Sequence, residues 1–188
     1  EDQSSGNRTI PFSRNLFIER SDFQEEANAK YFRLTIGKEV RLKNGYIIKG
    51  ESVVKDADGS LVEVHATYDA DSKSGSGSEA SLRKVKGTIH WVSEAHALDA
   101  EVRLYDRLFT EAAPDADKEK DFLDFINPTS LEIITAKVEP SLADAAPGRQ
   151  VQFQRTGYFV VDPDTTKGHI VFNRTVALRD SWGKVETN

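Results

Sequence analysis

The side chains in this sequence that are best suited to binding chemistry are cations, and they gather in one segment. Residues 28–50 carry six Lys or Arg residues against Glu39 alone, a local charge of +5 in a chain whose net charge is −6. Within this segment Arg41 and Lys43 are two positions apart, so in a strand they share one face, about 6.6 Å apart. Two cations on an exposed face can contact phosphates, although the segment taken alone favours an ordinary solvated strand face.

The residues just upstream extend this candidate site. Lys30 and Arg33 add charge, and Tyr31 and Phe32 add aromatic rings between them. Rings that stack bases, beside cations that contact phosphates, suit single-stranded or looped RNA whose bases are splayed outward.

A second candidate site lies in residues 150–155. Gln152 offers both a donor and an acceptor, and Arg155 offers a rigid fork of donors, which are the groups that read base edges. Strand alternation puts these two side chains on opposite faces. For both to reach one ligand, Arg155 must lie past the strand end or at a bend near Thr156 and Gly157.

Enzymatic chemistry lacks its usual residues in this sequence. There is no cysteine, which excludes disulfides, thiolate metal ligands and a cysteine nucleophile. The four histidines share no i, i+2 or i, i+4 spacing, and neither a Gly-x-Ser-x-Gly nor a Gly-x-x-x-x-Gly-Lys motif occurs. We expect no catalytic residue, no metal site and no bound cofactor in this chain.

The elements that must position these residues read as strands. Short runs of strand-forming residues between turn residues indicate an all-β protein. The expected strands are 38–43, 46–54, 61–68, 85–92, 100–109, 131–138, 151–161 and 170–178. Asp58-Gly59 is the strongest hairpin signal, and the Ser/Gly-rich stretch 72–78 is expected to be a flexible loop without a function of its own.

The strands fall into two groups, which favours two small antiparallel β-barrels, since closure removes exposed strand edges. We expect a polar lead at 1–9, a first barrel at 10–109 with a strand shared with the second, a second barrel at 110–184, and a tail at 185–188. The acidic stretch 110–124 is expected to join the two barrels.

The sequence shows neither a membrane-spanning segment nor a signal peptide. No apolar run approaches 18 residues, and the first nine residues lack the apolar core of a signal peptide, so we expect a cytoplasmic chain with no membrane segment. A chain that starts at Glu1 and contains no methionine is expected to be a fragment of a longer polypeptide.

Several blocks of the sequence resemble the C-terminal anticodon-binding region of the glutaminyl-tRNA synthetase family, which belongs to class I, in its bacterial form. The blocks are collinear and span most of the chain: 10–13, 37–42, 84–93, 102–109, 138–142, and 171–176 with 178–182. The resemblance implies two antiparallel β-barrels of the ribosomal-protein-like type that bind the anticodon loop of the tRNA for glutamine.

The resemblance also implies a role for individual residues. Arg33 matches an arginine on the third anticodon base and Arg41 one on the first, while Lys43 takes the place of a phosphate-contacting arginine. Gln152 and Arg155 match a pair that reads the central base, and Ser181 stands where a threonine often contributes. Lys30 adds charge to this set. Phe32 replaces a basic residue of some relatives, and Gln154 replaces an acidic one.

The class I signatures that bind ATP, a His-x-Gly-His element and a Lys-Met-Ser-Lys-Ser-type loop, are absent. The resemblance therefore implies that ATP and glutamine bind an N-terminal catalytic domain of the same polypeptide, and that this chain is a monomer, inactive by itself. Two alternatives stay open: a ribosomal-protein-like barrel that binds rRNA, and a secreted β-barrel adhesin glycosylated at Asn7 and Asn173.

Overall fold

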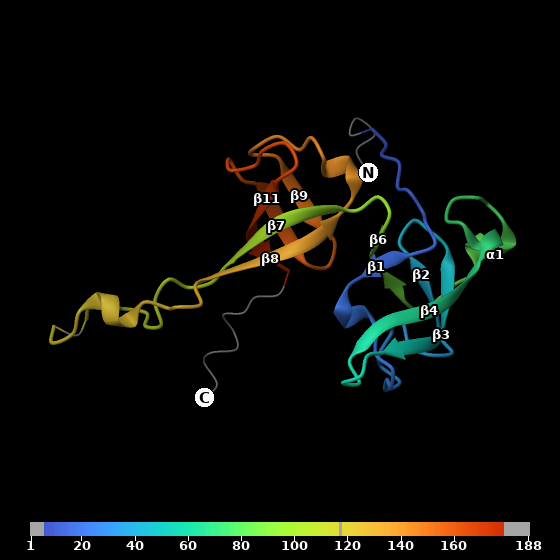
Figure 1. Cartoon of the computed structure of the whole chain (residues 1–188), viewed down its shortest axis with the longest axis horizontal. Helices are drawn as coiled ribbons and strands as arrows, with labels where there is room; N and C mark the ends of the chain where they lie inside the picture. The colour runs from blue at the N-terminus through green and yellow to red at the C-terminus, as the bar shows by residue number, and fades with distance from the viewer. Residues whose placement is uncertain (1–5, 117, 179–188) are drawn as a thin grey trace. The chain divides into compact units, whose positions relative to one another are not determined.

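The structure is a computed structural model, and it describes residues 6–116 and 118–178. Its contacts divide the chain into two compact units. The first unit is formed by residues 10–96, and the second by residues 97–188 together with 1–9. Each unit is built mainly from strands (Figure 1).

The first unit contains a four-stranded sheet in the order β4-β3-β2-β5. Its strands are β2 (Glu39–Leu42), β3 (Ile47–Lys55), β4 (Leu61–Asp69) and β5 (Thr88–Ile89). A separate antiparallel pair joins β1 (Leu16–Ile18) to β6 (Trp91–Ser93). Short helices complete the unit: two 3-10 turns at Arg20–Asp22 and Ala70–Ser72, and α1 (Glu79–Leu82).

Alternation along β2 explains how this sheet meets its core. Val40 and Leu42 are buried, while Arg41 between them is half-buried on the opposite side. The buried cluster also takes residues from the loops, from the other strands of this sheet and from β6 of the second sheet: Phe23, Leu34, Ile48, Ile89 and Trp91. The two small sheets and the loop before β2 are thus held by one apolar core.

The second unit contains a five-stranded sheet in the order β8-β7-β11-β10-β9. The strands are β7 (Leu98–Tyr105), β8 (Leu131–Val138), β9 (Gln150–Phe153), β10 (Gly157–Val161) and β11 (Ile170–Ala177). A 3-10 turn at Pro140–Leu142 follows β8. The core is a separate cluster that includes Val102, Phe159, Val161 and Phe172.

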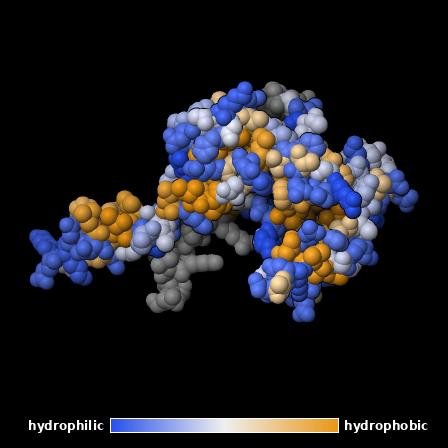
Figure 2. Space-filling view, viewed as in Figure 1, coloured by the Kyte–Doolittle hydropathy of each residue, from blue (hydrophilic) through white to orange (hydrophobic). Residues whose placement is uncertain are grey.

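Residues 106–130, which we call the arm, continue the β7–β8 hairpin beyond the sheet (Figure 1). An isolated bridge pairs Phe109 with Ile126, and a 3-10 turn spans Phe122–Phe125. Apolar side chains of the arm are exposed, and they form one of the apolar areas in the space-filling view (Figure 2).

The all-β class is confirmed, as is the hairpin at Asp58-Gly59, where Gly59 has a positive φ of 79° and the Asp56 amide donates to Ser60 O. The sheets differ from the expected purely antiparallel barrels in two respects. β2 pairs with β5, and β7 with β11, in parallel. In the described part of the chain the strands form no closed barrel.

The boundaries also differ from those expected. The units divide at residue 96, not at 109, because β7 hydrogen-bonds to β8 and β11 and so belongs to the second unit. The acidic stretch 110–124 consequently lies in the arm, inside that unit. The expected strand 151–161 is a hairpin of β9 and β10, because a three-residue turn interrupts it.

Candidate nucleic-acid interface

The guanidinium of Arg41 is bound within the first unit. From β2, its Nη1 donates to Ser72 O at 2.9 Å and Ser74 Oγ at 3.3 Å, and its Nη2 donates to the carbonyl oxygens of Ser81 and Arg83, each at 3.0 Å. Two of these hydrogen bonds tie the Ser/Gly-rich stretch 72–78 to β2, and the other two tie residues 81–83 just after it, so the loop that composition predicts to be flexible is anchored. A phosphate or base that Arg41 binds must replace one of these bonds or use the remaining Nε–H.

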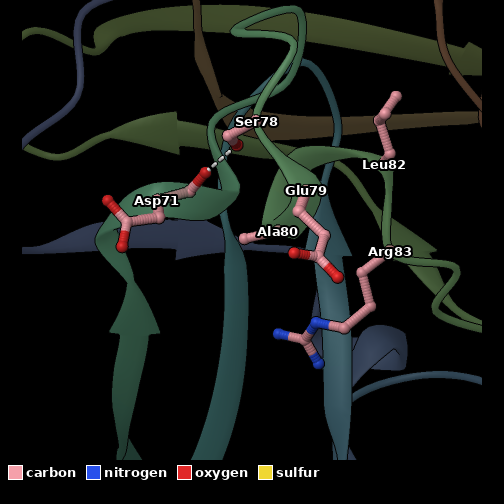
Figure 3. A pocket seen from close by; sticks show the side chains of 6 residues that line it. All are labelled: Asp71, Ser78, Glu79, Ala80, Leu82 and Arg83. Atoms are coloured by element: carbon pink, nitrogen blue, oxygen red, sulfur yellow. Dashed lines mark hydrogen bonds between the residues drawn. The ribbon is translucent and has the colours of Figure 1, made fainter.

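The anchored loop forms one side of an open hollow (Figure 3). Its lining mixes acidic, apolar and basic side chains: Asp71, Ser78, Glu79, Ala80, Leu82 and Arg83. Arg83 is the cation among them, and its ion pairs with Glu39 and Asp69 raise the pKa of its guanidinium. Because that charge is already paired, this hollow is a poor site for a phosphate.

Arg33 is held by a carboxylate beneath it. Its Nε lies 3.1 Å from Oδ1 of Asp22, whose side chain is fully buried, and its Nη1 donates to Phe32 O at 3.1 Å. About a third of the Arg33 side chain is exposed. The buried Asp22 therefore limits where the guanidinium can point, which favours directional contact with a base edge.

Lys43 and Lys30 lie in turns, not strands. β2 ends at Leu42, because the chain turns there: Asn44 has a φ of 57° and Gly45 N donates back to Leu42 O. The expectation that Lys43 shares a strand face with Arg41 is therefore wrong. The Lys43 side chain is exposed, while its carbonyl oxygen accepts from the Trp91 indole at 3.0 Å.

Lys86 is a binding candidate that the sequence reasoning missed. Its Nζ lies 5.6 Å from the centroid of the Phe32 ring, although the two residues are far apart in the chain. Contact between their backbones explains the approach: a Cβ on Gly87 would lie 2.5 Å from Phe32 O. The alternation of Lys84 and Lys86 just before β5 was the available signal, but only the fold shows what lies beside it.

The charges of the first unit fall into two groups. Lys49 and Lys55 are paired with Glu51 and Glu25. Six other lysines of this unit have no acidic partner within 4.0 Å among the residues that the structure describes: Lys30, Lys38, Lys43, Lys73, Lys84 and Lys86. Three of these belong to the 28–50 segment, so part of its +5 charge is available to an external anion.

Gln152 and Arg155 lie in the second unit, on the β9–β10 hairpin. Gln152 is exposed in β9, and Arg155 follows the strand end, in the turn, with a φ of 67°. The condition that Arg155 lie past the strand end or at a bend is therefore met. A positive φ at a residue other than glycine costs about 1 kcal/mol or more, so this turn is held by its surroundings. Ser181 lies outside the described residues.

The cross-strand neighbour of Gln152 was also missed by the sequence reasoning. Tyr158 of β10 pairs with Gln152 of β9 and is 47% exposed. Directly opposite residues on one face of an antiparallel pair can touch the same ligand. The pairing places an aromatic ring beside the amide that is predicted to read a base.

Another charged cluster occupies β7 and the loop before β11. Hydrogen bonds to Glu101 and Asp164 raise the pKa of Arg103. Asp162 accepts from the Asp164 amide and the Asn173 side chain, which hold the pKa of its carboxyl below the ordinary range. The Asn173 amide is thus engaged with a carboxylate, which argues against its use as a glycosylation acceptor.

Within residues 6–116 and 118–178, no three His, Asp or Glu side chains are grouped closely enough to hold a metal ion. In the same residues no helix is both long and apolar enough to cross a membrane.

Cations and aromatic rings on β-sheet units are typical of RNA-binding modules, and comparison with known families shows which family this chain resembles. Two family models match the chain, both described as the anticodon-binding domain of class I (E and Q) tRNA synthetases. One matches residues 1–69 and the other residues 88–162. The chain belongs to this family of anticodon-binding domains.

Comparison with individual proteins gives a more specific result than the family models. The chain is 58% identical, over 99% of its length, to a glutamine–tRNA ligase of Rhodopirellula baltica. It is 56% identical over 95% of its length to the glutamine–tRNA ligase of Cupriavidus taiwanensis, and 55% over 96% to that of Escherichia coli O157:H7. The chain spans about a third of the length of these relatives, from 30% to 32%.

Proposed function

We propose that this chain is the anticodon-binding part of a glutaminyl-tRNA synthetase and that it binds the anticodon loop of the tRNA for glutamine. The observation that carries the proposal is the similarity to glutamine–tRNA ligases across 95–99% of the chain. The complete enzyme would attach glutamine to its tRNA with ATP. Both small molecules would bind the remainder of the polypeptide, so this chain holds no cofactor and is inactive alone.

The proposed contacts are distributed over both units. Arg33 and Arg41 contribute base contacts and Lys43 and Lys30 phosphate contacts from the first unit, while Gln152 and Arg155 contribute from the second. Ser181 is a further proposed contact. Phosphate contacts supply most of the affinity and its salt dependence, whereas base-edge hydrogen bonds supply the choice of sequence.

The test is a titration of the chain with a fluorescent anticodon stem-loop at several salt concentrations. The glutamine anticodon should bind more tightly than a loop of scrambled sequence. Lys43→Ala should lower the slope of log K against log salt, while leaving the preference between the two loops unchanged. Lys118→Ala, in the acidic arm, is the matched control and should change neither. Equal binding of both loops by the wild-type chain would refute the proposal.

Both alternatives to this function are less well supported. A ribosomal-protein-like rRNA-binding barrel would show no preference for the glutamine anticodon, and neither family model describes it. A secreted adhesin would need an Asn acceptor such as Asn173, whose amide is hydrogen-bonded to Asp162. We propose a cytoplasmic location. We also propose a monomeric state, and light scattering on the purified chain would test that state.

The arm supports a contact with the remainder of the polypeptide, the catalytic domain in this proposal. Its exposed apolar side chains include Leu108, Phe122, Leu123 and Ile126, each at least 43% exposed. The relatives carry about two thirds of their length outside the matched region, which supplies the covering surface. Hydrogen exchange of residues 108–126 should slow in the complete enzyme relative to this chain, and unchanged exchange would contradict the contact.

A further inference from the structure

Phe32 is an aromatic side chain on the outside of the first unit. It is 46% exposed and is not part of the apolar cluster that forms the core. Its backbone is nevertheless fixed, since its carbonyl oxygen accepts from Arg33 and lies against Gly87. The ring is therefore presented to solvent from a well-supported position.

The Lys86 ammonium lies over this exposed ring, 5.6 Å from its centroid. This separation is within the distance of about 6 Å at which a cation is attracted to an aromatic face. Neither Lys86 nor the nearby Lys84 has a carboxylate within ion-pair distance in the described part of the chain. Lys30, two residues before Phe32, is also without such a partner. The two segments that supply Phe32 and Lys86 thus carry positive charge that the described residues do not neutralise.

We infer that Phe32 and Lys86 form a stacking site for one unstacked nucleotide of the anticodon loop. Phe32 takes the base on its face and Lys86 takes the phosphate. The inference deepens the proposed function and rests on it. Every base has a π-face that can stack on an aromatic ring, and a lysine beside the ring reaches the backbone phosphate of the same nucleotide.

Arg33 indicates which nucleotide this is. Arg33 follows Phe32 directly in the chain, and the buried Asp22 holds its guanidinium in place. A base that Arg33 contacts therefore lies close to the Phe32 ring. The nucleotide on Phe32 is therefore the neighbour of the one that Arg33 contacts.

The alternative occupant is an apolar segment of the remaining polypeptide. Lys86 over the ring, with Lys30 and Lys84 on the two segments that carry Phe32 and Lys86, favours a polyanion over such a segment, because covering these lysines without acidic partners would bury uncompensated charge. RNA supplies one phosphate for each nucleotide and satisfies both parts of the site.

The experiment is a titration of the 188-residue chain and its variants with the fluorescent glutamine anticodon stem-loop, with thermal unfolding recorded in parallel. Phe32→Leu should weaken binding at least about 5-fold, the lower end of the range for loss of one base–aromatic stack, whereas Phe32→Tyr should retain it. Lys86→Met should reduce the slope of log K against log salt by about 0.7, the value for one contact to a single strand.

Matched controls exist in the arm. Phe122 is 50% exposed, and Lys120 lies 5.5 Å from the ring of Phe125, a pair similar to Lys86 and Phe32. Phe122→Leu and Lys120→Met should leave both the affinity and the salt slope unchanged.

The outcomes are separable. If the wild-type chain prefers the glutamine anticodon but Phe32→Leu and Lys86→Met bind it as tightly and with the same salt slope, the stacking site is wrong and the proposed function stands. If these variants bind RNA normally but weaken association with the remaining polypeptide, the occupant is protein and the inference is overturned. If the wild-type chain shows no preference, both proposals fail. Should Phe32→Leu unfold, the slope of Lys86→Met decides.

Discussion

Arg41 has a structural task as well as a proposed contact with RNA. Its two Nη atoms donate to four acceptors on residues 72–83, and three of these acceptors are backbone carbonyl oxygens. A planar guanidinium offers five donors spread over a rigid fork, whereas the ammonium of a lysine offers three donors on one nitrogen and cannot reach four acceptors placed in this way. Binding of an anion by Arg41 is therefore coupled to the conformation of this loop.

Arg41→Lys should lower the free energy of unfolding by about 1–2 kcal/mol, because charge-assisted hydrogen bonds to buried or half-buried acceptors are lost. Amide exchange of residues 72–83 should also become faster. Denaturant unfolding and hydrogen exchange measure these effects. Arg83→Lys is the control, since its exposed ion pairs are worth less than about 1 kcal/mol. Equal effects of the two substitutions would contradict the anchoring role of Arg41.

The ionisation of Asp162 makes the stability of the second unit depend on pH. Its pKa is lowered first by the hydrogen bond from the Asp164 amide and then by that from Asn173. A carboxyl whose folded-state pKa is lowered stabilises the fold above its unfolded-state pKa of about 4, and this contribution is lost as the pH falls through the folded-state pKa.

Asp162→Asn should therefore destabilise the chain at neutral pH, and the difference from wild type should shrink as the pH falls below about 4. Urea unfolding of both proteins between pH 7 and pH 3 measures the difference. A difference that stays constant over this range would show that the ionised form of Asp162 is not preferred in the folded state.

The β9–β10 hairpin shows how one element sets a proposed site. Its turn carries Arg155 beyond the end of β9, and its pairing puts Tyr158 opposite Gln152. On the other side β10 pairs with β11, with a register shift between Tyr158 and Phe159. Because Gly157 has no side chain, β10 can lie this close to β11: a Cβ at this position would be only 2.6 Å from Val176 O.

Gly157→Ala should destabilise the second unit by about 1–3 kcal/mol, because the added methyl group forces β10 away from β11. Denaturant unfolding measures the loss, and RNA titration should show weaker binding if the hairpin carries the contacts of Gln152. Thr156→Ala in the adjacent turn is the control and should change stability little. A fully stable Gly157→Ala chain would mean that β11 shifts without cost.

The molecule as a whole consists of two units, each with its own apolar core. Phe23, Leu34 and Trp91 belong to the core of the first unit, and Phe159 and Phe172 to that of the second. An independent core is the physical requirement for independent folding. RNA contacts spread over two such units would make affinity depend on both being folded.

A polypeptide of residues 10–96 should accordingly fold by itself, with one cooperative thermal transition and slow amide exchange in β3 and β4. Circular dichroism and hydrogen exchange on this piece test the expectation. In the complete chain, Gly157→Ala should leave exchange in β3 and β4 unchanged. A non-cooperative transition of the 10–96 piece would contradict the division into two units.

Local pattern was sufficient to predict several features of this protein. Alternation at Val40, Arg41 and Leu42 predicted correctly which side chains of β2 face the core, and Asp58-Gly59 predicted its hairpin, because a period of two and a positive φ are properties of the chain itself. The collinear blocks of residues predicted the family, which the comparisons confirm. Short strands between turn residues likewise predicted the all-β class.

Contacts between distant segments could not be predicted in this way. Because β7 pairs in parallel with β11, the division between the units lies elsewhere than expected. Because the chain turns at Asn44, Lys43 lies outside the strand in which it was expected. The bonds of Arg41 to the loop and the approach of Lys86 to Phe32 join residues 31 or more positions apart. Sequence spacing carries no information about such neighbours, because packing and hydrogen bonding in the folded chain bring them together.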